Sequence, residues 1–168
     1  MLRESPIMYV GAKTGRFPLS GVSGKRGTID FSITFGATGS LRALVCLEDT
    51  VSGRVLTIGL ATDNRLQITH QDQLAVLRAD VTNGFTADIA GAPAVFRYIW
   101  DSTAPVDGTN YSAFWKNGTK ATVASNGVAW TAFVPNRIRI GSEIGSELDF
   151  NGTIEYLQVS DTPVPWAG

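Results

Sequence analysis

The chain contains one cysteine, Cys46, and one histidine, His70. A single cysteine cannot form an internal disulfide, and it cannot supply the paired thiolates of a Cys-x-x-Cys metal site. Because Cys46 lies in the apolar run 44–47, we expect a buried and unreactive thiol. His70 lies beside the polar residues 71–73, and no Gly-x-Ser-x-Gly motif presents a serine nucleophile. We therefore expect an exposed turn histidine rather than a member of a catalytic triad.

Charge of one sign and long apolar runs are also missing. Charged residues make up 17% of the chain, and 14 basic and 15 acidic side chains leave a net charge of −1. This balance lacks the field that nucleic-acid or anionic-membrane binding needs, so we expect neither partner. No run is long enough to span a bilayer, and residues 1–6 lack the order of a secretory signal peptide. We expect a protein made in the cytoplasm without a signal peptide.

Alternation with a period of two is the pattern that the chain does contain. It is clearest over 28–35, where every second residue is apolar. Further strands are expected at 41–48, 54–60, 65–70, 74–79, 95–101, 111–116, 119–124, 137–141 and 152–160, and the last two are expected to form a pair. No segment has the pattern of a capped amphipathic helix. About ten short strands separated by Gly and Asn turns predict an all-β antiparallel sandwich.

The 168 residues suit one domain, and we expect three parts. Residues 1–27 are predicted to form an arm with a short strand at 7–10, and 28–161 the β-sandwich. Residues 162–168 are predicted to form a tail, because Pro163 and Pro165 cannot donate ladder hydrogen bonds.

The last third of the chain carries the most specific motifs. Asn117-Gly118 between two alternating runs predicts a hairpin with a type I′ turn, which needs positive φ at both positions. The phrases are Phe-Trp-Lys-Asn-Gly-Thr-Lys at 114–120, Arg-Ile-Arg-Ile-Gly at 137–141 and Phe-Asn-Gly-Thr-Ile-Glu-Tyr-Leu-Gln-Val-Ser at 150–160. Together they resemble the end of laminin G-like and concanavalin A-like domains. The resemblance implies a jelly roll that binds sugars, proteins or calcium, or builds a surface.

Glu147 and Asp149 resemble part of the Glu-x-Asp-x-x-Glu motif of the glucanases with this fold. Retaining glycosidases need two carboxyl groups about 5–5.5 Å apart, which alternating positions on one strand can supply. Here the last acid of the motif is missing, and the next acid is Glu155. We therefore predict a protein that is not an enzyme, and we keep a minimal glucanase as a remote alternative.

Two kinds of ligand site are candidates. Asp101, Asp107 and Asn110 could offer oxygen atoms to calcium, although the same residue types are also what turns require. Trp130, Asn126 and Trp100 could form a sugar site, because an aromatic platform beside amide groups suits a glycan. The alternative for Trp100 is a place in the core.

The predicted function follows from the absence of a complete catalytic set. A small sandwich with an arm and a tail suits a subunit of a larger particle, and similar sandwiches occur among bacteriophage structural proteins. We expect a virion-surface protein, a capsid decoration or part of a head or tail fibre. It would form a homo-oligomer and bind other virion subunits through Arg16, Phe17 and Trp166. The alternative is a lectin-like glycan-binding module, with or without calcium.

Overall fold

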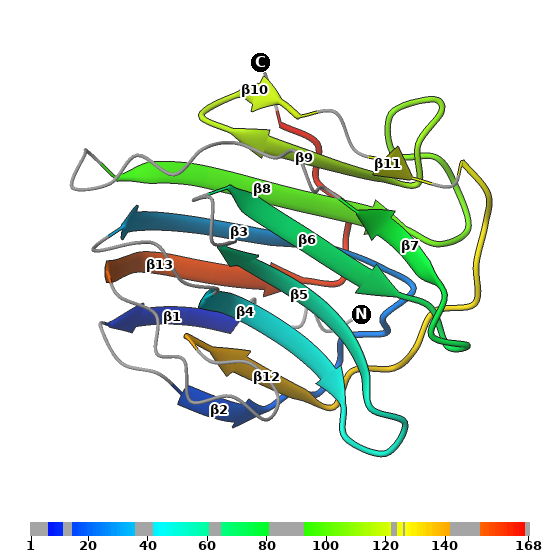
Figure 1. The fold of residues 1–168 in the computed structure, drawn as a ribbon, viewed down its shortest axis with the longest axis horizontal. Coiled ribbons are helices and arrows are strands. Elements are labelled where there is room, and N and C mark those ends of the chain that lie inside the picture. The colour runs from blue at the N-terminus through cyan, green and yellow to red at the C-terminus, as the bar shows by residue number, and fades with distance from the viewer. Residues whose placement is uncertain are drawn as a thin grey trace.

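The computed structural model describes residues 7–11, 15–35, 42–60, 65–80, 93–121, 124–125, 127–141 and 152–166. Within these ranges the chain forms thirteen strands in two antiparallel sheets (Figure 1). The predicted all-β sandwich is therefore confirmed. In the same ranges no helix has the length and apolar character needed to cross a membrane.

The six-stranded sheet has the order β1-β13-β3-β8-β9-β10. Its strands are β1 (Ile7–Gly11), β13 (Gly152–Ser160), β3 (Arg26–Phe35), β8 (Ala94–Asp101), β9 (Ser112–Lys116) and β10 (Thr119–Lys120). The seven-stranded sheet has the order β11-β7-β6-β5-β4-β12-β2. Its strands are β11 (Ala124–Ser125), β7 (Leu77–Asp80), β6 (Leu66–Gln71), β5 (Arg54–Leu60), β4 (Arg42–Asp49), β12 (Arg137–Ile140) and β2 (Gly15–Pro18).

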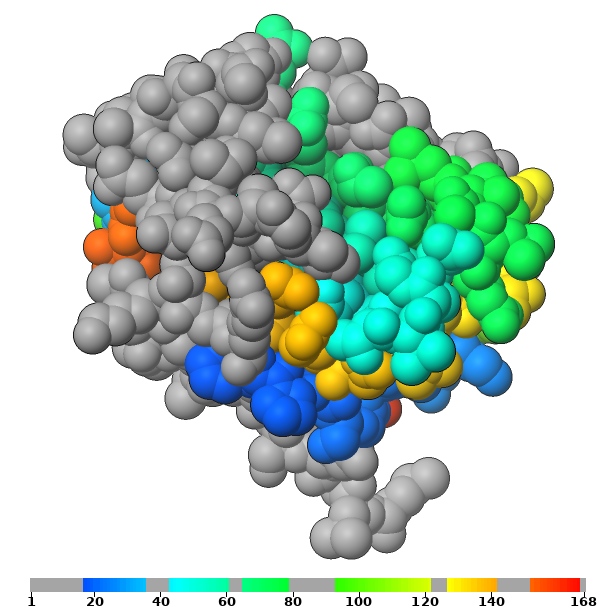
Figure 2. Space-filling model, turned by 60° about the horizontal axis from the view of Figure 1, so that its bottom comes forward, coloured from blue at the N-terminus to red at the C-terminus, as the bar shows by residue number. Residues whose placement is uncertain are grey.

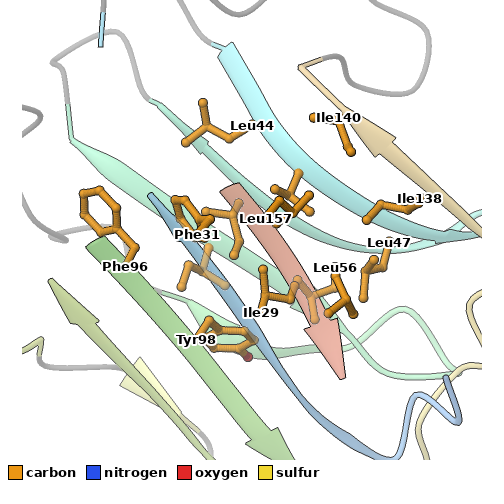
Figure 3. Packing of buried hydrophobic residues seen from close by; sticks show 14 of the residues in the cluster. Ile29, Phe31, Leu44, Leu47, Leu56, Phe96, Tyr98, Ile138, Ile140 and Leu157 are labelled. Atoms are coloured by element: carbon orange, nitrogen blue, oxygen red, sulfur yellow. The ribbon is translucent and has the colours of Figure 1, made fainter. Parts of the chain in front are cut away.

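The core lies between the sheets and is built from alternating residues of each strand. The apolar residues of β3 are buried, and so are Phe96, Tyr98 and Trp100 of β8. The Phe31 and Phe96 rings stack with their centroids 5.1 Å apart. Figure 3 shows these side chains opposite residues of the other sheet, among them Leu47. Each Å² of apolar surface that this cluster removes from water stabilises the fold by about 25 cal/mol.

The hairpin at Asn117-Gly118 has the predicted geometry. The φ angles are 47° at Asn117 and 82° at Gly118, as a type I′ turn requires. The Asn117 side-chain oxygen accepts a hydrogen bond from the Val95 amide at 2.8 Å, which ties the turn to β8. The sequence therefore specified this turn locally.

Two strand assignments need correction. The segments 137–141 and 152–160 do not pair, because β12 lies between β4 and β2 in one sheet and β13 lies between β1 and β3 in the other. The predicted strand 119–124 is divided between the sheets, with β10 on β9 and β11 on β7. In both cases the connection crosses from one sheet to the other, which alternation along a single strand does not reveal.

The N-terminal segment supplies one edge strand to each sheet. The predicted strand at 7–10 is present as β1, which pairs with β13, while β2 pairs with β12. In Figure 1 both strands lie along the lower side of the sandwich. In Figure 2 the blue atoms of the β2 segment lie against the gold atoms of the β12 segment. The division of the chain at residue 27 stays a prediction.

Gly27 of β3 lies close to Ser160 of β13 and to Trp100 of β8, so a substitution there tests this packing. A Cβ atom there would lie 2.5 Å from the Ser160 carbonyl oxygen and 2.6 Å from an indole carbon of Trp100. We expect Gly27→Ala to lower the free energy of unfolding by about 1–3 kcal/mol, because neither neighbour can move freely. Urea unfolding measures this change. The control is Thr153→Ala on an exposed position, with an expected effect within about 0.5 kcal/mol. An equal effect of the two substitutions would contradict the packing described here.

Candidate functional site

The outer face of the seven-stranded sheet gathers polar residues from neighbouring strands. Ile138 and Ile140 of β12 point into the core, so Arg137 and Arg139 lie on the opposite face. On β4, Glu48 lies opposite Arg137 in the register, and Cys46 lies opposite Arg139. The same face continues across β5 and β6.

Short polar side chains occupy this face on β5 and β6. Thr57 pairs with Cys46 on one side and with Thr69 on the other. Residues at alternating positions share its exposure, each being half-buried although it points away from the core: Val55, Thr57, Gln67, Thr69 and Gln71. The face therefore offers hydroxyl and amide groups at a partly sheltered surface. We call Glu48, Thr57, Gln67, Thr69, Arg137 and Arg139 the outer polar face.

An ion-paired triad forms one end of the outer polar face. The Glu48 carboxylate accepts a hydrogen bond from Nε of Arg139 at 2.9 Å and another from Nε of Arg137. The Glu48 side chain is only 1% exposed, and the exposures of Arg139 and Arg137 are 7% and 35%. A buried carboxylate is costly unless it is paired, and two guanidinium groups satisfy it here. The triad keeps one net positive charge.

The ion pairs with Glu48 do not use all the hydrogen-bond donors of the two arginines. A guanidinium carries five N–H donors, and both contacts with Glu48 engage Nε. Over the part of the chain that the structure describes, no hydrogen bond engages the Nη atoms of Arg137 or Arg139. Arg137 in particular is partly exposed, so an anion can reach this end of the face. Sequence reasoning missed the triad, although the alternation in Arg-Ile-Arg-Ile placed both arginines on one face.

The predicted calcium ligands serve local turns. Asp107 accepts hydrogen bonds from the Asn110 amide at 2.7 Å and from the Asn110 side chain at 3.0 Å, and it forms an ion pair with Lys120. Burial raises the pKa of Asp107, but the bonds from Lys120 and Asn110 outweigh it and hold the pKa below its usual range. Asp101 instead accepts bonds from Thr103 in its own turn.

Asp107 and Asn110 are thus brought together, while Asp101 has other partners. The Lys120 ammonium group already supplies a positive charge to Asp107. Throughout the described ranges no three His, Cys, Asp or Glu residues are grouped so that they could hold a metal ion. Calcium binding stays a prediction.

The two tryptophans that were predicted to form an exposed platform for a sugar are buried. Trp100 is 1% exposed, and its Nε1 donates a hydrogen bond to the Gly24 carbonyl at 2.9 Å. Trp130 lies in a segment without strand structure, as expected, but it is 8% exposed and its ring contacts Tyr111 and His70. Neither ring offers an open face for stacking. Asn126 lies outside the described residues.

His70 is a core residue and not the exposed turn histidine that we expected. It lies on the inner face of β6 with 1% exposure, among the rings of Tyr98, Trp100, Trp130 and Phe133. Its Nδ1 lies 2.9 Å from the Tyr98 hydroxyl. Burial lowers the pKa of His70 to about 3, although the charge of Asp72 acts in the opposite direction. The prediction failed because β6 continues to Gln71. His70 therefore lies within the strand and not in a turn, and its side chain faces the core.

His70 gives the fold a specific pH dependence. The unfolded chain binds a proton at His70 below about pH 6.5, whereas the folded chain does so only near pH 3. The free energy of unfolding should therefore fall as the pH decreases from 6.5 towards 4.5, a range above the titration of most carboxyl groups. Urea unfolding of the wild type and of His70→Gln should show a weaker decrease in the variant. Equal slopes in this pH range would refute the assignment.

The other predicted site residues lie on β13, on β2, in the tail or outside the described residues. Glu147 and Asp149 lie outside the described residues, and Glu155 lies exposed on β13, near the Thr34 hydroxyl. On β2, Arg16 pairs with Arg139 and Phe17 with Ile138, and Phe17 is 40% exposed.

Trp166, the third predicted assembly contact, packs against its own chain. Its ring lies 5.2 Å from the Arg97 guanidinium carbon. The role of Arg16, Phe17 and Trp166 in assembly stays a prediction.

Comparisons with known proteins support the fold. No protein-family model matches the sequence, and no curated protein sequence matches it. Among solved structures, the NanB sialidase of Streptococcus pneumoniae has a TM-score of 0.70 at 14% identity, over 96% of this chain and 27% of that one. The CBM40 module of the Ruminococcus gnavus IT-sialidase, bound to α2,6 sialyllactose, has a TM-score of 0.68 at 12% identity, over 95% and 94%.

A pentraxin from Limulus polyphemus, described as heptameric and SAP-like, has a TM-score of 0.60 at 16% identity, over 95% of this chain and 71% of that one. The chain thus spans about a quarter of the sialidase but nearly all of the CBM40 module. At these identities the likeness establishes the fold alone, an antiparallel β-sandwich of the jelly-roll class.

Proposed function

We propose that this chain is a non-catalytic, lectin-like module that binds a glycan on the outer polar face. The observation that carries the proposal is a set of half-buried hydroxyl, amide and guanidinium groups on β5, β6 and β12, with the buried Glu48 of β4 holding the guanidinium groups in place. Similar structures support it, because one of them is a carbohydrate-binding module bound to a sialylated sugar. This was the alternative reading of the sequence, and it has the better support.

The geometry suits a sugar chain lying across the strands. Neighbouring strands are about 4.8 Å apart, which is close to the length of one sugar ring. Thr57 and Thr69 therefore present hydroxyl groups at a spacing that can serve adjacent rings, with Gln67 at the next position on β6. The described part of this face has no exposed aromatic ring, so each contact is weak, and binding would gain strength from several copies acting together.

The triad suits a negatively charged sugar. Its net positive charge and the unused Nη donors of Arg137 and Arg139 match a carboxylate or sulfate group, which guanidinium binds in a fork. The same triad is a poor catalytic centre, because both arginines already hold the Glu48 carboxylate. The module would therefore bind an acidic glycan and leave it intact.

Blocking the outer polar face should abolish glycan binding. We expect Thr57→Tyr to reduce binding at least tenfold on an array of neutral and acidic glycans, because the ring fills the face between β4 and β6. Thr153→Tyr, on an exposed position of the six-stranded sheet, is the matched control and should bind normally. Circular dichroism checks that both variants fold. Absence of binding by the wild type to every glycan would end the proposal.

Removing the positive charge should reduce binding of acidic glycans selectively. A charge-assisted hydrogen bond contributes about 1.5–3 kcal/mol, so Arg137→Gln, at the more exposed arginine of the triad, should weaken binding of a sialylated glycan about 10–100-fold. Binding of its asialo form should change little. Arg26→Gln, at an exposed position outside the face, is the control. Titration calorimetry measures both ligands, and an equal loss for the two forms would show that the arginines do not recognise the acid.

The role on a virion surface, in assembly with other subunits, stays a prediction. Its support is that β1 and β2 are edge strands of the two sheets and lie on one side of the sandwich. Edge strands commonly pair with strands of other subunits. Light scattering tests the role: a stable homo-oligomer would support it, and a monomer at high concentration would count against it.

A further inference from the structure

The outer face of the six-stranded sheet carries a small second core. Ile99, Ala113 and Trp115 point away from the main core, yet their exposures are 0%, 0% and 9%. Val106 and Trp166 cover them. An apolar group on the outside of a sheet therefore stays dry because the C-terminal tail lies across it.

A pre-organised arginine holds the tail by its backbone. Nη1 of Arg97 lies 3.2 Å from the Pro165 carbonyl oxygen and 3.5 Å from that of Val164, and the guanidinium faces the Trp166 ring. Asp30 fixes Arg97 from the other side through an ion pair. The Arg97 side chain thus recognises two carbonyl groups and an aromatic ring at once.

Thr28 adds two further contacts with the tail backbone. Its hydroxyl accepts a hydrogen bond from the Val164 amide at 2.9 Å and donates one to the Thr162 carbonyl at 2.7 Å. We call Thr28, Arg97, Ile99, Ala113 and Trp115 the tail site. The tail site contains elements of peptide recognition, namely an aromatic side chain packed against an apolar cluster and hydrogen bonds to a proline-containing backbone.

The tail is not part of the sheet that it covers. Pro163 and Pro165 have no N–H group. Across the described ranges, no backbone-to-backbone hydrogen bond joins 162–166 to a strand. Release of the tail would therefore leave every strand pairing of both sheets in place. Only the contacts of the tail site would be lost, and an identical tail could restore them.

We propose that the tail site binds the C-terminal tail of a second copy of this chain, so that two copies exchange tails. The chemistry of the occupant is fixed by the contacts above, and a second copy carries the same sequence. Exchange of an identical element replaces each contact by its equivalent and costs little beyond the entropy of association. Each chain's own tail competes for the tail site at a high effective concentration, so exchange should require a high protein concentration.

A complementing pair of full-length variants tests the proposal. Trp166→Ala has a weakened tail and an open tail site, whereas Ala113→Arg has an intact tail and a blocked site. Each variant alone should remain a monomer by analytical ultracentrifugation, and the mixture should form a one-to-one heterodimer. If Ala113→Arg fails to fold by circular dichroism, Arg97→Ala takes its place, because its tail site has lost the contacts with the tail backbone and the Trp166 ring.

A second measurement separates tail exchange from other contacts. A fluorescent peptide of residues 160–168 should bind to Trp166→Ala and compete with the heterodimer, and the same peptide with Trp166→Ala should not. A mixture that stays monomeric at millimolar concentration would overturn the proposal, even if the peptide binds. A heterodimer that the wild-type peptide cannot dissociate would also overturn it, because another surface would then hold the copies together.

Discussion

Burial of the alternating faces of β3 and β8 against the other sheet is the constraint on which the rest of the structure depends. Because Tyr98 points into the core, its neighbour Arg97 must point outward. By the same alternation on β12, Ile138 points into the core and Arg139 lies on the outer face. A slip of one residue would exchange core and surface along a whole strand. The register that stabilises the fold therefore also positions both outer faces.

The two outer faces differ in how they are covered. On the six-stranded sheet the tail shields an apolar group, and Arg97 with Asp30 holds it in place. On the seven-stranded sheet the polar side chains of β5 and β6 are half-buried, and the buried Glu48 orients two arginines through their Nε atoms alone. Under the two proposals, one face would hold the tail of a second copy and the other an acidic sugar, so ligand binding and association would use separate surfaces.

The sequence predicted what depends on neighbours along the chain. The strand at 54–60, the Asn117-Gly118 turn and the buried Cys46 were all correct, since alternation and turn chemistry are local. Strand partners were not predictable in this way, because β12 and β13 lie in different sheets despite their proximity in sequence.

The site was harder to predict for the same reason. Glu48 meets Arg139 across 91 positions of the chain, and the burial of Trp130 depends on His70 and Tyr111.

The central claim, that a glycan binds on the outer polar face, is tested most directly by amide NMR during titration with α2,6 sialyllactose. The account predicts shifts concentrated in β4, β5, β6 and β12. Shifts confined to the six-stranded sheet, or none at millimolar sugar, would contradict it.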